Sequence, residues 1–343
     1  MKILILGGTQ FIGIHLVAAA RARGHEVTVF NRGTTPLVDA DGIEQITGDR
    51  HRDLARLAGR RWDAVVDTCG YVPSSLESST ATLVDAVDRY VFISSISVYA
   101  DFSTHGMDET APLATLSAES LEKAEAVDRS GRVTGSEYGG AYGALKVRCE
   151  DVVRSAFPER ALVVRPGLVA GSHDPTERFT YWVARVARGG EILAPGRPDR
   201  LIQYIDAADL ADWTIQSVER RATGIYNVTG PATDLTMAAF LEECRQVTAG
   251  DATFTWVPDA FLLQHEVKSW TEMPLWIPET ETGHSGLMHI DCRKAFASGL
   301  RPRPVRRTIE DVLAWANGPG ADRKRKNGLA EDRELELLRA WRG

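Results

Sequence analysis

Three side chains in the first half of this sequence have types and spacing suited to acid–base chemistry. Tyr142 and Lys146 are four residues apart, which on a helix places both on one face. Gly139 and Gly140 come just before them and predict that this helix begins directly afterwards. An ammonium group nearby favours the phenolate, so Tyr142 could exchange a proton at neutral pH although tyrosine normally ionises at about pH 10. Ser95 could bind a substrate oxygen and direct it toward Tyr142.

A glycine-rich turn near the N-terminus indicates where a nucleotide would bind. The first thirteen residues, MKILILGGTQFIG, predict a buried strand, a tight turn and the start of a helix. Gly7 and Gly13 let the backbone approach a bound group, and the helix offers unpaired N–H donors and the positive end of its dipole. A glycine turn and a Tyr–Lys pair are each weak signals alone. In this order along one chain they are specific, and they predict a diphosphate site followed by proton transfer.

Strands and helices alternate through the first half of the chain. Apolar strands are predicted at 2–6, 26–30, 44–47, 64–67 and 90–94, with helices between them. This order predicts the α/β class, with a doubly wound parallel sheet (Rossmann-like) and a ligand beyond the carboxyl ends of its strands. The side chains expected to face that crevice are Thr68, Cys69, Ser94 and Ser95.

The second half of the chain predicts a smaller lobe. We assign residues 1–170 to the nucleotide-binding domain, with a strand and helix near 201–228 returning to it, and 171–343 mainly to a C-terminal substrate-binding lobe. The aromatic-rich stretch 254–277 is compatible with a flexible lid or an aromatic wall over the substrate, or with ordinary packing. The last helix, 331–341, is amphipathic, and it docks on its own subunit or on a partner through a face that carries Leu335, Leu338 and Trp341.

The end of the second strand bears on the choice of cofactor. A carboxylate there would favour the free 2′-hydroxyl of NAD, but this sequence has Asn31 and Arg32. A guanidinium can hold a 2′-phosphate through two parallel hydrogen bonds, which favours NADP(H) over NAD(H). Arg32 is also compatible with a place over the adenine face, so NAD(H) stays open.

The sequence resembles the extended or atypical short-chain dehydrogenases/reductases, the NAD-dependent epimerase/dehydratase family. The resemblance is strong over residues 1–230 and rests on GGTQFIG, VFISSISVY, YGALK, VVRPGLVAG, QYIDAADLA and IYNVTG. It implies that Ser95 orients the substrate and that Tyr142 and Lys146 form the Y-x-x-x-K catalytic pair. It also implies adenine contacts at Asp49 and Arg50 and a nicotinamide contact at residues 166–168. The full set of expected cofactor contacts is Gly7, Thr9, Gln10, Phe11, Ile12, Gly13, Asn31, Arg32, Asp49, Arg50, Thr68, Cys69, Ser94, Tyr142, Lys146, Pro166 and Leu168.

Two departures from the family pattern narrow the chemistry. Gln10 stands where the family turn has its middle glycine, so its side chain must point away from the phosphates or donate to one. Ile96 and Ser97 stand where dehydratases of the family carry an acidic pair, which argues against 4,6-dehydration. The chemistry that remains is hydride transfer, which a reductase uses once and an epimerase uses twice.

Four residues are candidates for contacts with the substrate. Ser97 and Tyr138 lie close to the catalytic residues in sequence, and Arg178 and Arg197 could bind a phosphate or carboxylate. For each arginine a structural salt bridge is an equal alternative. His173 is interpreted as a loop residue, because the Tyr–Lys pair already supplies proton transfer.

The composition of the chain limits the classes of protein to which it can belong. The net charge of −7 gives no reason to expect nucleic acid, and the basic run from Arg323 to Lys326 is interpreted as a solvated turn. Four scattered cysteines suggest neither a metal site nor disulfides, as in a reducing cytoplasm. No membrane-spanning stretch or leader is evident, and a homodimer is implied only by the resemblance.

Three functions are compatible with these observations. The first is an NAD(P)-dependent oxidoreductase that reduces a ketone, or oxidises a secondary alcohol, of a small polar metabolite. The second is a nucleotide-sugar epimerase with tightly bound NAD. The third belongs to another class, a non-catalytic dinucleotide- or RNA-binding protein, which the intact Ser, Tyr and Lys set disfavours because a pure binder needs no acid–base pair.

Overall fold

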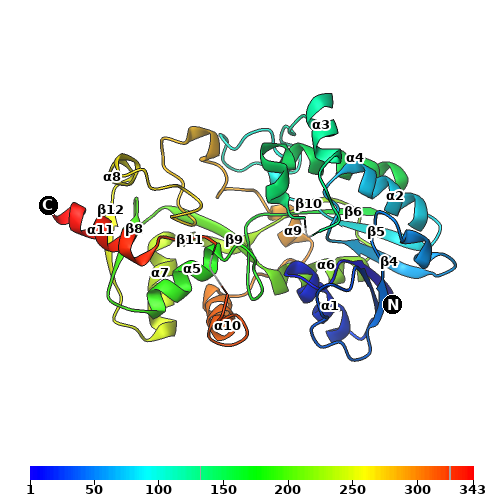
Figure 1. The fold of residues 1–343 in the computed structure, drawn as a ribbon, viewed down its shortest axis with the longest axis horizontal. Helices are drawn as coiled ribbons and strands as arrows, with labels where there is room; N and C mark the ends of the chain where they lie inside the picture. Colours follow the sequence, from blue (N-terminus) through cyan, green and yellow to red (C-terminus); the bar gives the residue numbers. More distant parts are fainter. Residues whose placement is uncertain (132, 324–325) are drawn as a thin grey trace.

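The computed structural model describes residues 1–131, 133–323 and 326–343. It contains a larger part built on one parallel sheet and a smaller second part, with the N-terminus in the first and the C-terminus at the far end of the second (Figure 1). The strand order of the large sheet is β10-β6-β5-β4-β1-β2-β3. Its strands are β1 (Lys2–Leu6), β2 (Glu26–Asn31), β3 (Glu44–Thr47), β4 (Trp62–Asp67), β5 (Val87–Ile93), β6 (Ala161–Pro166) and β10 (Gly224–Val228).

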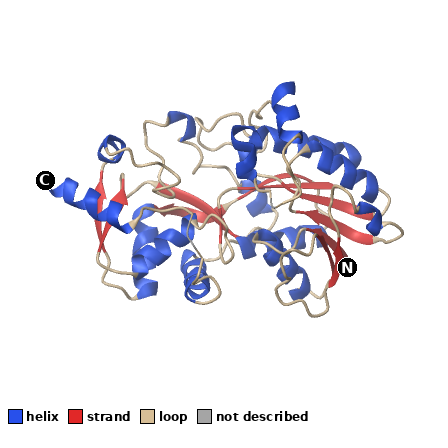
Figure 2. Ribbon diagram, in the orientation of Figure 1, coloured by secondary structure: helices blue, strands red, loops and turns tan. Residues whose placement is uncertain are grey.

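The large sheet is buried on both faces, which explains its continuous apolar strands. In β1, Ile3 and Ile5 face one core and Leu4 and Leu6 face the other, as the two-residue period of a strand requires. Helices α1 (Ile12–Ala22) and α6 (Ala207–Glu219) cover the first face. Helices α2 (Pro73–Leu83) and α4 (Tyr142–Ala156) cover the second (Figure 2). The predicted doubly wound α/β fold is confirmed.

The second part has its own apolar core. It holds the sheet β11-β9-β7 and the parallel pair β12 and β8. Its strands are β7 (Val169–Ala170), β8 (Glu191–Pro195), β9 (Leu201–Asp206), β11 (Gly230–Thr236) and β12 (Thr253–Val257). Its helices are α5 (Arg178–Ala187), α7 (Met237–Thr248), α8 (Asp259–Gln264), α10 (Val305–Asn317) and α11 (Glu331–Arg342), while α9 (Arg293–Ala297) lies against β10.

One predicted return to the large sheet takes a different form. The strand at 201–206, β9, pairs with β7 and β11 in the small sheet, because Ile202 and Tyr204 belong to the core of the second part. Helix α6 and strand β10, which follow β9, do return to the large sheet.

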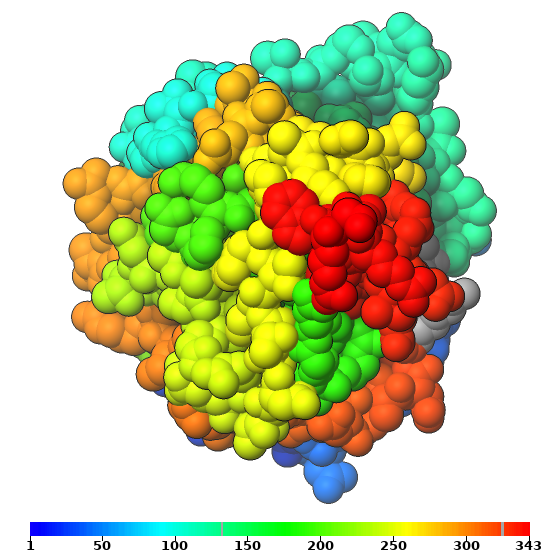
Figure 3. All heavy atoms as spheres, turned by 90° about the vertical axis from the view of Figure 1, so that its left-hand side faces the viewer, coloured from blue at the N-terminus to red at the C-terminus, as the bar shows by residue number. Residues whose placement is uncertain are grey.

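The last helix docks on its own subunit. Leu337 and Leu338 of α11 are buried, and Glu334 pairs with Arg185 of α5 at 2.6 Å. Of the three residues expected on the docking face, Leu338 is buried, and Trp341, although 41% exposed, packs edge-on against Phe261 with ring centres 5.0 Å apart. Leu335 is 45% exposed, and Leu337 takes its place in the core. Figure 3 shows α11, in red, lying across the second part.

Two features are absent from the described residues. None of the helices they form is long and apolar enough to cross a membrane. No group of three or more His, Cys, Asp or Glu side chains among them is placed to hold a metal ion.

Candidate functional site

A cavity of about 1280 Å³ lies beyond the carboxyl ends of the central strands. Its walls come from both parts of the molecule, with the glycine turn on one side and residues 269–288 on another. Most predicted site residues line it: Gly7, Thr9, Gln10, Phe11, Ile12, Gly13, Asn31, Arg32, Asp49, Arg50, Thr68, Cys69, Ser95, Ser97, Tyr138, Tyr142, Leu168 and Arg178. Four do not, namely Ser94, Lys146, Pro166 and Arg197.

The glycine turn is shaped for a bound group. Gly7 has a φ of 112°, and a Cβ there would lie 2.3 Å from Oγ1 of Thr68. A Cβ on Gly13 would lie 2.8 Å from the backbone nitrogen of Gly8. In the described part of the chain no side chain caps α1. The N–H groups of Gly13 and Ile14 donate to the carbonyls of Gln10 and Phe11, each at 2.9 Å, so α1 offers a ligand chiefly the positive end of its dipole. The glycines have no side chain to block a ligand, and the helix dipole favours an anion, so the turn fits the diphosphate of a dinucleotide.

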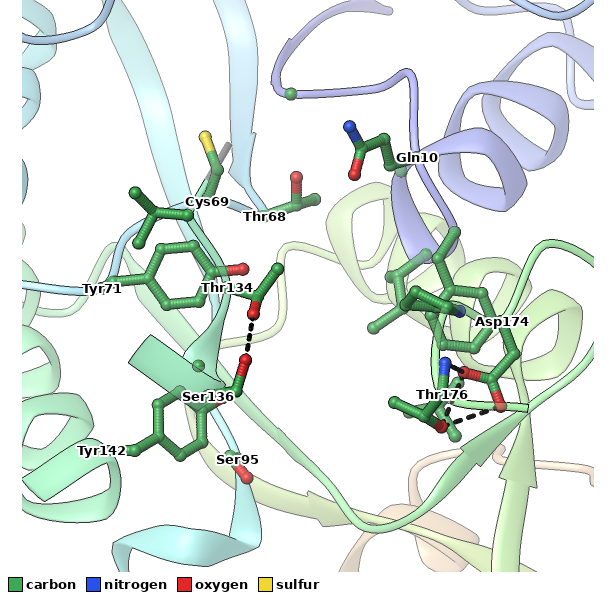
Figure 4. Close-up of a pocket in the computed structure, with 18 of the residues that line it drawn as sticks. Gln10, Thr68, Cys69, Tyr71, Ser95, Thr134, Ser136, Tyr142, Asp174 and Thr176 are labelled. Atoms are coloured by element: carbon green, nitrogen blue, oxygen red, sulfur yellow. Dashed lines mark hydrogen bonds between the residues drawn. The ribbon is translucent and has the colours of Figure 1, made fainter. Parts of the chain in front are cut away.

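Gln10 replaces the middle glycine without blocking this turn. Its side chain is exposed, and Figure 4 shows its amide projecting into the cavity on the side of Thr68. The amide nitrogen is a hydrogen-bond donor, so Gln10 can contribute a contact to a phosphate oxygen.

The end of β2 is tied to the turn. The Asn31 amide donates to the Gly7 carbonyl at 3.1 Å, and its oxygen accepts from the Gly33 N–H at 2.8 Å. Asn31 therefore fixes the local backbone. The Arg32 guanidinium lies at the cavity edge and donates to the carbonyls of Ser130, at 2.9 Å, and Gly131.

Asp49 and Arg50 take different places after β3. Asp49 lines the cavity and accepts a hydrogen bond from the His51 N–H at 2.8 Å. The Arg50 guanidinium turns inward, where both terminal nitrogens lie 2.8 Å from the carboxylate of Asp67. The expected adenine contact by this guanidinium is corrected to a buried ion pair, because Asp67 at the end of β4 is completely buried and needs a cation.

The start of α4 brings Tyr142 next to Ser95. Helix α4 packs so closely on the short helix Ile96–Val98 that a Cβ on Gly143 would lie 1.8 Å from the Ser97 carbonyl oxygen. The Ser95 hydroxyl donates to Oγ of Ser97 at 3.0 Å and accepts from its N–H at 3.1 Å. Figure 4 shows Ser95 and Tyr142 together on one wall of the cavity.

Lys146 lies one helical turn behind Tyr142. Its side chain is buried, and its ammonium donates to the carbonyls of Gly70 at 2.8 Å and Ile93 at 3.0 Å. The ammonium nitrogen lies 5.9 Å from the centre of the Tyr142 ring. The predicted helical spacing thus places a positive charge beside the phenol, although the ammonium itself is directed at backbone.

Two further expectations are corrected behind the cavity wall. The Ser94 hydroxyl, expected in the crevice, donates to Oε1 of Glu150 at 2.6 Å, because the chain stays extended past the end of β5 and successive side chains face opposite sides. Pro166 is buried in β6, where it pairs with Val228, while Leu168 reaches the cavity.

The predicted substrate residues separate into two groups. Tyr138 stacks on Tyr71 with ring centres 6.0 Å apart, and both line the cavity. The Arg178 Nε donates to the Trp270 carbonyl at 3.1 Å, with the guanidinium 5.2 Å from that indole ring. Arg197 instead pairs with Glu279 at 2.7 Å on the surface, which is the structural alternative considered for it.

Sequence reasoning missed one acidic group. Asp174 lines the cavity although it is only 1% exposed, and burial raises its pKa to about 6. It accepts hydrogen bonds from the N–H and hydroxyl of Thr176, and Figure 4 shows this pair across the cavity from Tyr142. The turn-rich SHDPT loop was the available signal, but its polarity is equally typical of a solvated loop.

The family profile described as "NAD dependent epimerase/dehydratase family" matches residues 3–229. An epimerase family protein of Bos taurus is 28% identical over 257 residues, 70% of this chain and 78% of that protein. The 2′-dehydrokanamycin reductase of Streptomyces kanamyceticus is 28% identical over 200 residues, 55% of this chain and 50% of the reductase. The 2-alkyl-3-oxoalkanoate reductase of Stenotrophomonas maltophilia is 27% identical over 217 residues, which are 62% of this chain and 64% of that reductase. The chain thus spans less than two thirds of the length of either reductase.

Solved structures share the fold. The UDP-glucuronic acid 4-epimerase of Bacillus cereus, in complex with NAD, superposes with a TM-score of 0.64 at 15% identity, covering 92% of this chain and 99% of that one. The UDP-N-acetylglucosamine 4-epimerase of Methanobrevibacter ruminantium gives 0.67 at 16% identity, covering 93% and 98%. With the profile match over most of the chain, the sequence belongs to the NAD-dependent epimerase/dehydratase family of extended short-chain dehydrogenases/reductases, which implies an NAD(P) dinucleotide as its cofactor.

Proposed function

We propose that this protein is an NAD(P)H-dependent reductase that converts a ketone of a small polar metabolite into a secondary alcohol, or runs the reverse oxidation. The observation that carries the proposal is that Ser95 and Tyr142 open onto the same cavity as the turn from Gly7 to Gly13. A substrate in this cavity would meet a proton donor and a hydroxyl anchor beside the dinucleotide site.

Each residue has a defined task in this reaction. The Ser95 hydroxyl and the Tyr142 phenol bind the carbonyl oxygen, and Tyr142 gives it a proton as negative charge develops there. The buried Lys146 ammonium stabilises the phenolate that remains. A bound nicotinamide supplies the hydride. Arg178, which has no ion-pair partner among the described residues, anchors an anionic or polar group of the substrate.

Two curated relatives favour a single hydride transfer, because both are named as reductases. The nucleotide-sugar epimerases among the solved structures share only the fold at this level of identity. Epimerisation is therefore the alternative, and it predicts a retained NAD. NADP(H) is the proposed cofactor because Arg32 stands at the end of β2 without a neighbouring carboxylate on that strand.

Two measurements test the proposal. The purified protein is denatured and any released nucleotide is identified by mass, which separates a reductase that exchanges its cofactor from an epimerase that keeps NAD. NADPH and NADH oxidation is then followed with a panel of small polar ketones. We expect turnover with at least one ketone; inertness toward the panel together with tightly retained NAD would overturn the reductase assignment.

RNA binding is the contrasting outcome. A chloroplast stem-loop binding protein of Arabidopsis thaliana is 25% identical over 256 residues, 67% of this chain and 58% of that protein. Salt-dependent retention of RNA without any cofactor oxidation would favour that class. The placement of Ser95 and Tyr142 on the cavity wall supports the enzyme instead.

A further inference from the structure

The basic run near the C-terminus reaches the candidate site. Arg323 and Lys326 are exposed, as expected of a solvated turn, but both also line the cavity. Residues 324 and 325 of this run lie outside the described residues. The two described cations therefore border the ligand space rather than a featureless surface.

Contacts with the cavity wall hold this segment in place. The Arg323 guanidinium lies 5.3 Å from the centre of the Trp315 ring, and its Nε is 3.2 Å from Oε1 of Glu177. Close to Lys326, the Asn327 amide donates to the Thr176 carbonyl at 2.7 Å.

The chain is anchored again immediately afterwards. The Gly328 N–H donates to the Thr271 carbonyl at 2.7 Å, and Leu329 is buried in the core of the second part. These contacts fix Lys326 between the loop that carries Asp174 and the loop that carries Trp270, both of which line the cavity.

Arg323 also lies near His173 on the cavity wall. Burial, the His15 ring and the Arg323 charge together lower the pKa of His173, which lines the cavity. The His173 ring lies 6.5 Å from that of His15, which in turn lies 6.4 Å from that of Phe11, the residue at the start of α1. The Trp315 ring, which contacts the Arg323 guanidinium, lies 5.6 Å from the His173 ring, so neighbouring rings extend from Arg323 to Phe11 in the glycine turn.

The pairing of these cations is incomplete. Glu177 offsets Arg323, but Lys326 has no ion-pair or hydrogen-bond partner within the part of the chain that the structure describes. An unpaired ammonium at the mouth of a cavity attracts an anion. It destabilises the folded protein little, because water still solvates it.

We propose that Arg323 and Lys326 form a cationic rim that binds the phosphate groups of an organic diphosphate in this cavity. The diphosphate belongs to the dinucleotide itself or to a nucleotide-linked substrate. The inference rests on the proposed function for the identity of the site, and it adds a phosphate contact from the C-terminal segment that lies beyond the family profile at 3–229.

Binding measurements on charge-removing variants test the rim. Lys326→Gln, Arg323→Gln and the double variant are compared with wild type by calorimetric titration of NADPH, NADH, inorganic pyrophosphate and uridine diphosphate, the last with and without saturating cofactor. Adenosine and uridine serve as phosphate-free probes. Arg339→Gln, which removes an exposed charge from α11 away from the cavity, is the matched control.

We expect the double variant to bind its diphosphate ligand roughly tenfold more weakly, with a smaller dependence on salt, and to bind the nucleosides as wild type does. Weaker NADPH and NADH binding identifies the cofactor as the source. Weaker uridine diphosphate binding alone identifies a nucleotide-linked substrate. Lys326→Arg should retain wild-type affinity because it keeps the charge.

Affinities equal to those of Arg339→Gln for every phosphate probe would overturn the rim. Arg323 also pairs with Glu177, so thermal unfolding checks each variant; Lys326→Gln removes no described contact and carries the test alone if Arg323→Gln is destabilised. A wild-type protein that binds dinucleotide but reduces no ketone contradicts the proposed function and leaves the rim standing. Turnover combined with unchanged affinities contradicts only the rim.

Discussion

Glu150 and Arg165 form a two-contact ion pair, at 2.9 and 2.6 Å, with both side chains 1% exposed. Glu150 lies two helical turns after Tyr142 on α4, and Arg165 lies on β6. Because Glu150 also accepts from the Ser94 hydroxyl, the pair joins α4 to the residue that follows β5 and precedes Ser95. The relative placement of Ser95 and Tyr142 therefore depends on a buried charge pair that touches neither.

Removing one charge of this pair should destabilise the whole domain. Glu150→Gln leaves Arg165 buried without a counter-charge, and we expect a loss of about 3 kcal/mol in the free energy of unfolding. Urea unfolding measures it. The control is Glu119→Gln, which breaks only an exposed pair with Lys123 and should change stability little. Equal stability of the two variants would show that the pair is not a structural link.

The close contact of Gly143 with Ser97 should make this glycine irreplaceable. Gly143→Ala pushes α4 away from the short helix that carries Ser97, so we expect turnover to fall at least tenfold and stability to fall by about 2 kcal/mol. Gly140→Ala is the matched control, because nothing lies within 4 Å of a Cβ there. Steady-state kinetics and thermal unfolding compare the two. Full activity in Gly143→Ala would mean that the spacing of α4 and Ser97 does not set the site.

Loss of the phenol should separate chemistry from binding. Tyr142→Phe removes the proton donor while keeping the ring, so turnover should fall roughly 100-fold or more with dinucleotide affinity largely unchanged. Tyr226→Phe, on β10 and away from the cavity, is the control. A Tyr142→Phe variant that keeps the wild-type rate on the true substrate would remove Tyr142 from the mechanism.

Local sequence signals predicted the fold, and they predicted which residues of the glycine turn line the cavity. Strand apolarity and the glycine turn specify β1 and α1, and the four-residue spacing placed Tyr142 and Lys146 on one helix. The inward turn of Arg50 was not predictable, because it depends on Asp67, which is distant in sequence and becomes a neighbour only through sheet pairing.

The substrate end was less predictable for the same reason. Trp256, Trp270 and Trp276 belong to one aromatic stretch, yet only Trp270 lines the cavity, Trp276 is buried in the core and Trp256 packs against that core. Both interpretations of the stretch therefore apply, each to different residues. Which tryptophan faces the ligand depends on the irregular path of the loop, including a φ of 63° at Trp270, and no periodicity encodes that path.

Cofactor preference should depend on Arg32. Its guanidinium lies at the cavity edge after β2, so Arg32→Ala should weaken NADPH binding about tenfold more than NADH binding. Fluorescence titration of both cofactors measures the ratio. Arg61→Ala, which changes an exposed arginine outside the cavity, is the control. Equal weakening for the two cofactors would place Arg32 over the adenine instead and would remove the argument for NADP(H).

Asp174 should make stability depend on pH in an unusual direction. Burial raises its folded-state pKa to about 6, above the value of about 3.9 expected for the unfolded chain. Between these two pH values the native state holds a proton that the unfolded chain has lost. The contribution of this carboxyl to the free energy of unfolding is therefore largest below the unfolded pKa and is lost as pH rises through the folded-state pKa. Asp174→Asn removes the titrating group. The free energy of unfolding of the variant minus that of wild type should therefore increase between about pH 4 and pH 7, by roughly 2 kcal/mol.

The exposed carboxyl of Asp128 supplies the control for this titration. Hydrogen bonds from the Ser130 N–H and hydroxyl lower its pKa, so Asp128→Asn should show no gain that grows with pH. Urea unfolding at several pH values compares both variants with wild type. A constant difference between Asp174→Asn and wild type across this range would show that the Asp174 carboxyl is ionised throughout, held by the Thr176 N–H and hydroxyl and by the nearby Arg178 charge. In that case Asp174 would present a fixed negative charge across the cavity from Tyr142, and the substrate group that Arg178 binds would have to share the cation with it.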